Sequence, residues 1–184
     1  MNYNRKRNRL QNYDYSTPGY YFATICTKGM LEYFGRMQNN EMELNDKGRI
    51  VQKCWLDLPN HYKNCKLHAF VIMPNHIHGI IEIVGNGFKP FQNKPTTDKI
   101  QNEPTTNKRN GLKPFPTYGL SEIIRGFKTF SSKNINQKSK HKFTWQKSFY
   151  DHIIRNDEEL IRISDYIEKN PLLWKQDEYF IELE

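Results

Sequence analysis

Apolar and aromatic residues recur along the chain with two different periods, which predict strands and helices in alternation. Residues 20–26 are rich in aromatic and β-branched side chains and follow a Pro-Gly turn, so we expect a strand there. In residues 45–58 the apolar side chains fall on one helical face, and Pro59 is expected to end that helix. Residues 67–73 and 76–84 are expected to form the next two strands.

Only Pro74 and Asn75 separate these two strands, which predicts a tight hairpin with a loop of two or four residues. A two-residue loop would place four pairs opposite one another: Met73 with His76, Val71 with His78, Ala69 with Ile80, and Leu67 with Glu82. The other face would carry Phe70, Ile72, Ile77, Ile81 and Ile83. Because both faces are then largely apolar, we expect a central hairpin that is covered on both sides.

The second half of the chain predicts two further helices and a strand. Residues 118–135 have one apolar helical face, and residues 144–154 mix aromatic and β-branched side chains as in a strand. A last helix starts at Asn156 or Asp157 and stops at Asn170, before a proline. The order β-α-β-β-α-β-α predicts an α+β, ferredoxin-like (RRM-like) antiparallel sheet with an extra C-terminal helix.

Residues 85–117 interrupt this pattern. They hold five of the nine prolines and three of the ten glycines, with many Asn, Thr and Lys residues. We therefore expect a mobile, basic insertion within a single domain that spans residues 1–184. Its charge fits a segment that follows a phosphate backbone, and it fits a solvated linker without a role equally well.

The charge of the chain changes this picture by suggesting a partner. The 184 residues carry a formal charge of +8, but residues 85–147 hold 13 basic and 3 acidic residues, whereas residues 148–184 hold 4 and 10. A basic excess favours a polyanion, usually nucleic acid, although a soluble basic surface explains the charge as well. The acidic end fits carboxylates beside a divalent metal or a solvated helix face.

Other classes are excluded by what the sequence does not contain. The three cysteines form no C-x-x-C pair, so a disulfide framework or a cysteine zinc site is not expected. No apolar run reaches the length of a membrane span, and no apolar stretch follows the basic N-terminus as in a signal peptide. We therefore expect a cytoplasmic protein without a membrane partner.

Two pairs of residues carry candidate chemistry. His76 and His78 alternate on one strand face, where two imidazoles can bind one metal ion or simply be hydrogen-bonded structure. Tyr166 and Asn170 lie four residues apart on the last helix, where a half-buried ring and a helix cap are the structural alternatives. A phenol with a pKa of about 10 is a poor nucleophile, but a divalent metal that polarises a phosphodiester would help it.

Three segments in order along the chain resemble the single-tyrosine HUH transposases of the IS200-like superfamily. Residues 73–81 (MPNHIHGII) resemble their His-hydrophobic-His motif. The REP-associated tyrosine transposase branch in particular is similar to residues 120–128 (LSEIIRGFK) and to residues 145–156 (WQKSFYDHIIRN) with 165–171 (DYIEKNP). The likeness runs from about Tyr20 to Trp174 and is interrupted by the insertion.

This resemblance implies roles for the candidate residues. His76 and His78 match the metal-binding pair, Tyr166 the nucleophile, and Asn170 the helix position of a third metal ligand. The implied reaction is the nicking of single-stranded DNA with Mg²⁺ or Mn²⁺, through a 5′-phosphotyrosine and followed by strand transfer. The implied substrate is a hairpin-forming repeat. His152 falls in a motif without an assigned role, and the protein is expected to be a monomer or a homodimer.

DNA recognition is expected in the N-terminal arm, the insertion and the 118–147 segment. The candidate DNA-binding residues are Arg5, Arg7, Arg125, Lys128 and Lys133. The alternative function is a ferredoxin-like module that binds nucleic acid without catalysis, which would present exposed aromatic side chains on its sheet. A histidine-triad nucleotide hydrolase is disfavoured because Ile80 stands where a third alternating histidine is needed.

Overall fold

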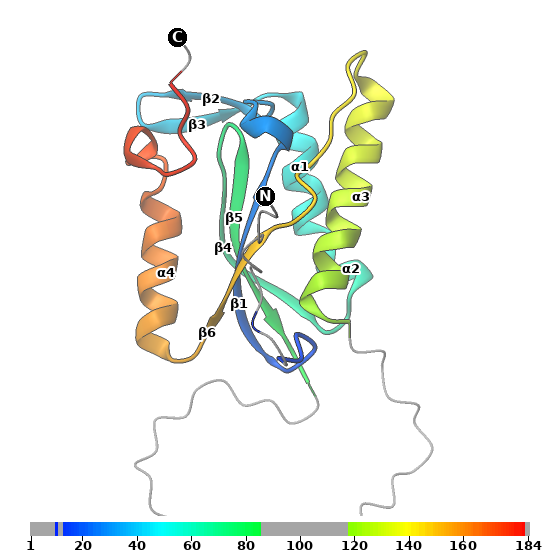
Figure 1. The fold of residues 1–184 in the computed structure, drawn as a ribbon, viewed down its shortest axis with the longest axis vertical. Coiled ribbons are helices and arrows are strands. Elements are labelled where there is room, and N and C mark those ends of the chain that lie inside the picture. The colour runs from blue at the N-terminus through cyan, green and yellow to red at the C-terminus, as the bar shows by residue number, and fades with distance from the viewer. Residues whose placement is uncertain (1–9, 11–12, 86–117, 183–184) are drawn as a thin grey trace, which may run out of the picture.

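A four-stranded antiparallel sheet forms the centre of the molecule. A computed structural model of the chain describes residues 10, 13–85 and 118–182. The sheet has the order β4-β5-β1-β6, with β1 (Gly19–Cys26), β4 (Cys65–Ile72), β5 (His76–Ile83) and β6 (Tyr150–Ile154). Figure 1 shows helices α1 (Asp46–Leu56) and α3 (Leu120–Lys138) on one side of the sheet and α4 (Asp157–Lys169) on the other. The predicted ferredoxin-like α+β fold with an extra C-terminal helix is confirmed.

The α1/α3 face of the sheet holds the larger apolar core. Alternate residues of β1 and β5 point to this side, and the side chains that meet there are fully buried. Gly79 has a packing role, because a Cβ at this position would lie 2.4 Å from the Trp55 ring. The buried cluster includes Tyr21, Ile25, Trp55, Ile77, Ile81, Ile123 and Phe127.

The α4 face holds a smaller apolar cluster. Ile163 and Ile167 form the buried stripe of α4, and they pack on Tyr20, Phe22, Ile80 and Ile154 of the sheet. The helix begins at Asn156, whose side-chain oxygen accepts a hydrogen bond of 2.8 Å from the backbone N–H of Glu159. Because helices cover both faces, all eight residues of β5 are buried, as expected for a central strand.

The predicted register of the β4–β5 hairpin is right near the turn and wrong beyond it. Val71 pairs with His78 as the two-residue loop requires, and the Met73 N–H donates to the His76 carbonyl at 2.8 Å. An irregularity between Leu67 and Phe70 then shifts the register. Leu67 consequently pairs with Ile81 and not with Glu82, and Ala69 has no paired partner at Ile80, because a bulge inserts one residue into one strand.

Several elements lie outside the sequence prediction. A small hairpin of β2 (Gly35–Gln38) and β3 (Glu41–Leu44) precedes α1, and its turn residues Asn39 and Asn40 have φ values of 51° and 63°. Positive φ at both positions is typical of a type I′ turn, which asparagine tolerates. Helix α1 ends at Leu56, before Pro59. Pro59 itself lies in the first turn of a separate short helix, α2 (Leu58–His61).

Two short 3-10 helices complete the described residues: η1 (Lys28–Met30) and η2 (Trp174–Gln176). The sequence prediction for the insertion at 85–117 lies almost wholly outside the residues that the structure describes, as do Arg5 and Arg7. Among the described residues, no helix has the length and apolarity that crossing a membrane requires.

Candidate active site

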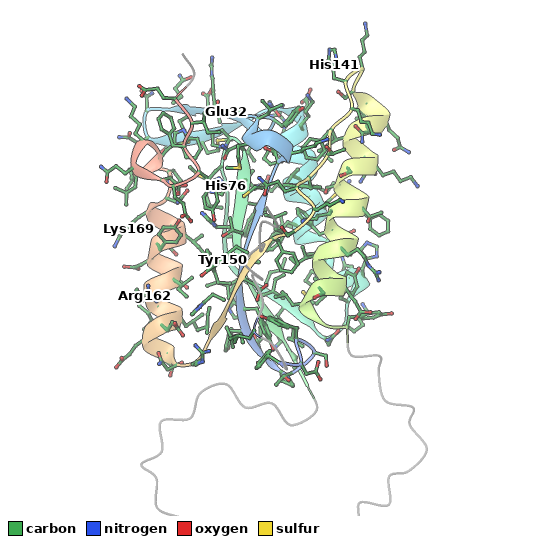
Figure 2. The ribbon with its side chains drawn as sticks, in the orientation of Figure 1. Glu32, His76, His141, Tyr150, Arg162 and Lys169 are labelled. Atoms are coloured by element: carbon green, nitrogen blue, oxygen red, sulfur yellow. The ribbon has the colours of Figure 1, made fainter. Side chains whose placement is uncertain are left out.

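Two histidines lie side by side in the middle of the sheet, on the face that α4 covers. His76 and His78 come from alternate positions of β5, and their ring centroids are 4.3 Å apart. Both side chains are buried, at 0% and 1% exposure. Figure 2 shows His76 between the upper part of the sheet and the chain that follows α4.

Each imidazole is held through its Nδ1 atom. Nδ1 of His76 lies 2.8 Å from Oδ1 of Asn75, and Nδ1 of His78 lies 2.9 Å from Oγ1 of Thr24 on β1. When these nitrogens carry the protons, both Nε2 atoms offer lone pairs, as in metal-binding histidines. Burial lowers the pKa of both rings, and for His76 the neighbouring His78 lowers it further, so the neutral form that binds a metal is favoured.

Helix α4 brings Tyr166 and Asn170 to this pair. The Tyr166 hydroxyl lies 3.2 Å from Nε2 of His78. Asn170 is the C-cap residue of α4 and is 2% exposed, and the structure places its side chain in the same cluster. The spacing of four residues puts both side chains on one side of the helix. All of these groups belong to one chain, so the cluster forms without a second copy.

Asp177 is a member of the cluster that the sequence reasoning missed. After α4 the chain folds back through η2, and Oδ2 of Asp177 accepts hydrogen bonds from Nδ2 of Asn170 at 2.6 Å and from the Tyr166 hydroxyl at 3.4 Å. The same oxygen is 4.0 Å from Nε2 of His78. Burial opposes its charge, but the nearby His78 imidazole and hydrogen bonds from the Tyr179 backbone N–H and the Asn170 side chain hold the pKa of Asp177 below its usual range.

The return of the chain over the site is fixed by Asn75. Its side-chain N–H group donates to the Tyr179 carbonyl at 2.8 Å and to the Met30 carbonyl at 3.2 Å. The Tyr179 ring lies against both histidines, with its centroid 4.8 Å from that of His76 and 5.7 Å from that of His78. Asn75 therefore orients His76 and holds the segment that carries Asp177.

The ionisation of Tyr166 is disfavoured by this environment. Burial raises the pKa of the phenol, and the negative charges of Asp177 and Glu178 raise it further. Its side chain is nevertheless only half-buried, since Tyr166 keeps 39% exposure. The hydroxyl therefore needs a nearby cation before it can act as a nucleophile at neutral pH.

The cluster has the donors that a divalent cation requires. His76, His78 and Asp177 each offer one ligand atom, and these atoms lie within 4.8 Å of one another. Nε2 of His76 and Oδ1 of Asn170 are buried and have no hydrogen-bond partner. A buried polar atom without a partner is costly, so two such acceptors in one cluster fit a site that is completed by an ion.

His152 belongs to a separate group on the same face. Its Nε2 lies 2.6 Å from Oε1 of Glu159 in the first turn of α4, and Arg162 is 3.7 Å from that oxygen. Among the described residues, the cluster of possible metal ligands does not include His152. This histidine therefore links β6 to α4 and is not brought to the candidate ion.

The predicted DNA contacts on α3 lie on the other side of the sheet. Arg125 and Lys133 are exposed on α3, and Figure 1 shows α3 across the sheet from α4, the helix that carries Tyr166. Lys128 is turned inward, since its ammonium donates to the carbonyls of Gln146 and Ser148 at 3.0 and 2.8 Å. A DNA strand that contacts both α3 and Tyr166 must therefore pass around an edge of the sheet.

Comparison with known proteins links a segment of the chain to a family. Residues 112–170, which include Tyr166 and Asn170 but not the histidine pair, match the family described as "Transposase IS200 like". A protein of Haemophilus influenzae that is itself uncharacterized is 36% identical over 180 residues, which cover 98% of this chain and 95% of that protein.

A solved structure shares the fold. A REP-associated tyrosine transposase bound to a REP hairpin aligns with a TM-score of 0.53 and 17% sequence identity, over 89% of this chain and 73% of the other. At this identity the likeness shows the fold alone. Residues 112–170 of this chain therefore match the IS200-like transposase family, and the chain shares its fold with a solved transposase.

Proposed function

We propose that this chain nicks single-stranded DNA and transfers the strand through a 5′-phosphotyrosine, with Tyr166 as the nucleophile. The observation that carries the proposal is the Tyr166 hydroxyl, 3.2 Å from Nε2 of His78 and beside two buried acceptor atoms without partners. The match of residues 112–170 to a transposase family supports it, because transposases are enzymes that act on DNA.

His76 and His78 would hold a divalent ion, Mg²⁺ or Mn²⁺, together with an oxygen of Asn170 or Asp177. When bound, the ion would polarise the scissile phosphate and offset its negative charge. Asp177 also has a positioning role in this proposal. Its Oδ2 accepts the Asn170 amide N–H at 2.6 Å, which leaves Oδ1 of Asn170 as the free ligand atom.

The chemical step follows from the groups around the phenol. The Tyr166 oxygen forms a bond to the phosphorus, the bond from phosphorus to the 3′-oxygen breaks, and the 3′-oxygen leaves as a hydroxyl with a proton from solvent. His78 at 3.2 Å and Asp177 at 3.4 Å are within reach of the phenolic proton, and Asp177 would be the acceptor if His78 held the ion. Attack by another 3′-hydroxyl on the phosphotyrosine then rejoins DNA and releases Tyr166.

We propose a single strand with a hairpin as the substrate, because the solved relative with the same fold was bound to a REP hairpin. The alternative of a non-catalytic RRM-like module finds less support in this fold. Such modules bind nucleic acid on an open sheet face, whereas α4 covers that face here through Ile163 and Ile167. Arg5, Arg7, Arg125, Lys128 and Lys133 stay predicted DNA contacts.

The test is the formation of a covalent adduct. The full chain is incubated with a hairpin-bearing DNA single strand and Mg²⁺ or Mn²⁺, and denaturing gel electrophoresis then separates a protein–DNA adduct from free protein. We expect the adduct with the wild type and none with Tyr166→Phe, which lacks the attacking oxygen.

Tyr33→Phe is the matched control, since Tyr33 packs on Phe143 in the core of the opposite face. It should form the adduct at the wild-type rate. Two results would contradict the proposal: a wild type that binds the strand but forms no adduct with either ion, or an adduct that persists in Tyr166→Phe.

A further inference from the structure

A pocket opens beside Tyr166, between the sheet and α4, and reaches His78. Its volume is about 370 Å³, at the lower end of the range for small-molecule sites. Its walls come from β1, β6, α4 and the segment after η2. Its lining includes Phe22, Tyr150, His152, Arg162, Tyr166 and Glu178, together with His78 of the candidate metal pair.

Aromatic rings form the floor and two walls of this pocket. The buried ring of Phe22 lies 6.2 Å from the Tyr166 ring and 6.3 Å from the Tyr150 ring, and both neighbours stand edge-on to it. Tyr150 and Tyr166 keep 46% and 39% exposure, so their rings are available to a ligand. Tyr150 comes from β6 and Arg162 from α4 (Figure 2).

The charges around the pocket favour an uncharged ligand. Its one guanidinium, on Arg162, lies 3.7 Å from the Glu159 carboxylate, and the wall also carries the carboxylate of Glu178. Apart from the ion that His78 would help to hold, the pocket therefore offers a phosphate as much negative as positive charge. A planar base meets aromatic rings for stacking and polar edges on His152 and Glu178, which suits it better.

We propose that this pocket binds one unpaired base of the DNA strand, that of the nucleotide whose 5′-phosphate Tyr166 attacks. This inference rests on the proposed function. In an in-line attack the leaving 3′-oxygen lies opposite the phenol, so the upstream nucleotide extends away from Tyr166. The downstream nucleotide is attached at the side of the phosphorus and stays linked to the protein, and its base can reach a pocket that Tyr166 itself lines.

The first test reads binding without the chemical step. Tyr166→Phe is mixed with hairpin-bearing strands that carry 2-aminopurine at the nucleotide just downstream or just upstream of the cleavage position, and its fluorescence is followed. We expect strong quenching for the downstream label, because the base stacks on aromatic rings, and little change for the upstream label. Tyr150→Ala in the same background should abolish the quenching, whereas Phe130→Ala, an equally exposed aromatic on α3, should not.

The second test reads the adduct. On a strand with an abasic downstream nucleotide, the wild type should form the adduct more slowly by about 5- to 150-fold, the range of one lost stacking contact. In Tyr150→Ala the missing base should matter much less, because the stacking partner is already gone. Two results would overturn the pocket assignment. One is quenching of the upstream label in place of the downstream label. The other is an adduct rate that falls by the same factor on the abasic strand in the wild type and in Tyr150→Ala.

The two proposals fail in different ways. If the wild type forms an adduct at Tyr166 but the downstream base makes no difference to quenching or rate, only the pocket assignment fails. If no adduct forms with intact strands that the protein binds, the nuclease proposal fails, and the pocket assignment fails with it.

Discussion

The two faces of the sheet are built by the same alternation of side chains but hold different chemistry. On the α1/α3 face, Trp55, Ile77 and Phe127 belong to one apolar core. On the α4 face the apolar layer is smaller, and next to it two histidines, an asparagine and an aspartate are buried together. One face therefore stabilises the fold, and the other carries polar groups whose burial costs stability.

The two faces also differ in which of their buried polar atoms lack a hydrogen-bond partner. On the α1/α3 face, the Ser131 hydroxyl donates to the Phe127 carbonyl at 2.7 Å and accepts the Trp145 indole N–H at 3.0 Å. The indole N–H of Trp55 lacks a partner there, but it is a donor and cannot bind a cation. On the α4 face the unpaired atoms, His76 Nε2 and Asn170 Oδ1, are both potential metal ligands.

The largest effect is expected from His76→Ala. Adduct formation should fall by about 1,000-fold, as expected when several kcal/mol of charge stabilisation by the metal are lost. At 100 times its dissociation constant, Mn²⁺ should raise the melting temperature of the wild type by about 5–10 °C, and that of His76→Ala hardly at all. His68→Ala, at the other end of the same face, should keep both responses. An undiminished adduct in His76→Ala would break the contrast between the faces.

Phe127→Ala should have the opposite profile. Its ring is 1% exposed in the apolar core, so the free energy of unfolding should fall by about 3–5 kcal/mol. Urea denaturation measures this loss. At a temperature where the variant is folded, its melting temperature should still respond to Mn²⁺. A lost metal response in the folded variant would show that the faces are not independent.

Asp177→Asn sharpens the role of the residue that the sequence did not reveal. The neutral amide keeps the size of the side chain but removes the charge that contacts Asn170 and Tyr166. Metal affinity, measured by titration calorimetry, should fall by about 10- to 100-fold, as for other groups that bind or orient metal ligands. Glu182→Gln, an exposed acid in the same segment, should bind the metal like the wild type. Equal affinity in both variants would remove Asp177 from the site.

The smallest effect is expected on the α3 surface. Arg125→Gln and Lys133→Gln should each weaken strand binding by only a few-fold, and each should lower the slope of log affinity against log salt by about 0.7 if the residue contacts a phosphate of a single strand. Fluorescence anisotropy at several salt concentrations measures this slope. An unchanged slope in both variants would show that the DNA does not reach the α1/α3 side of the molecule.

The regular elements and four of the site residues follow from local patterns. The helical stripe of Ile163 and Ile167 predicts which side of α4 faces the sheet, and it places Tyr166 and Asn170 beside that stripe. The alternation of β5 puts His76 and His78 on one face. The two periods place each pair on one face of its own element, and the family resemblance implied that the two pairs meet at one site.

Asp177 could not be predicted in this way. It lies after a helix that a proline ends, in a segment without apolar periodicity, and its position depends on the turn through η2 and on the contacts of Asn75. The bulge between Leu67 and Phe70 also cannot be recognised from the alternation of apolar and polar residues along this strand. The β2–β3 hairpin has a visible turn signal in the sequence, because Asn39 and Asn40 are typical of a tight turn. Its two strands are too short to show a clear alternation of apolar and polar residues.

Tyr166 is expected to become covalently linked to DNA. Digestion of the adduct with trypsin and nuclease, followed by mass spectrometry, locates the link directly. Residues 163–169 (ISDYIEK) form one tryptic peptide with Tyr166 as its single tyrosine. We predict that this peptide carries the mass of a 5′-phosphonucleotide. A link in any other peptide, or no link under conditions where the strand is bound and the metal is present, would contradict the account.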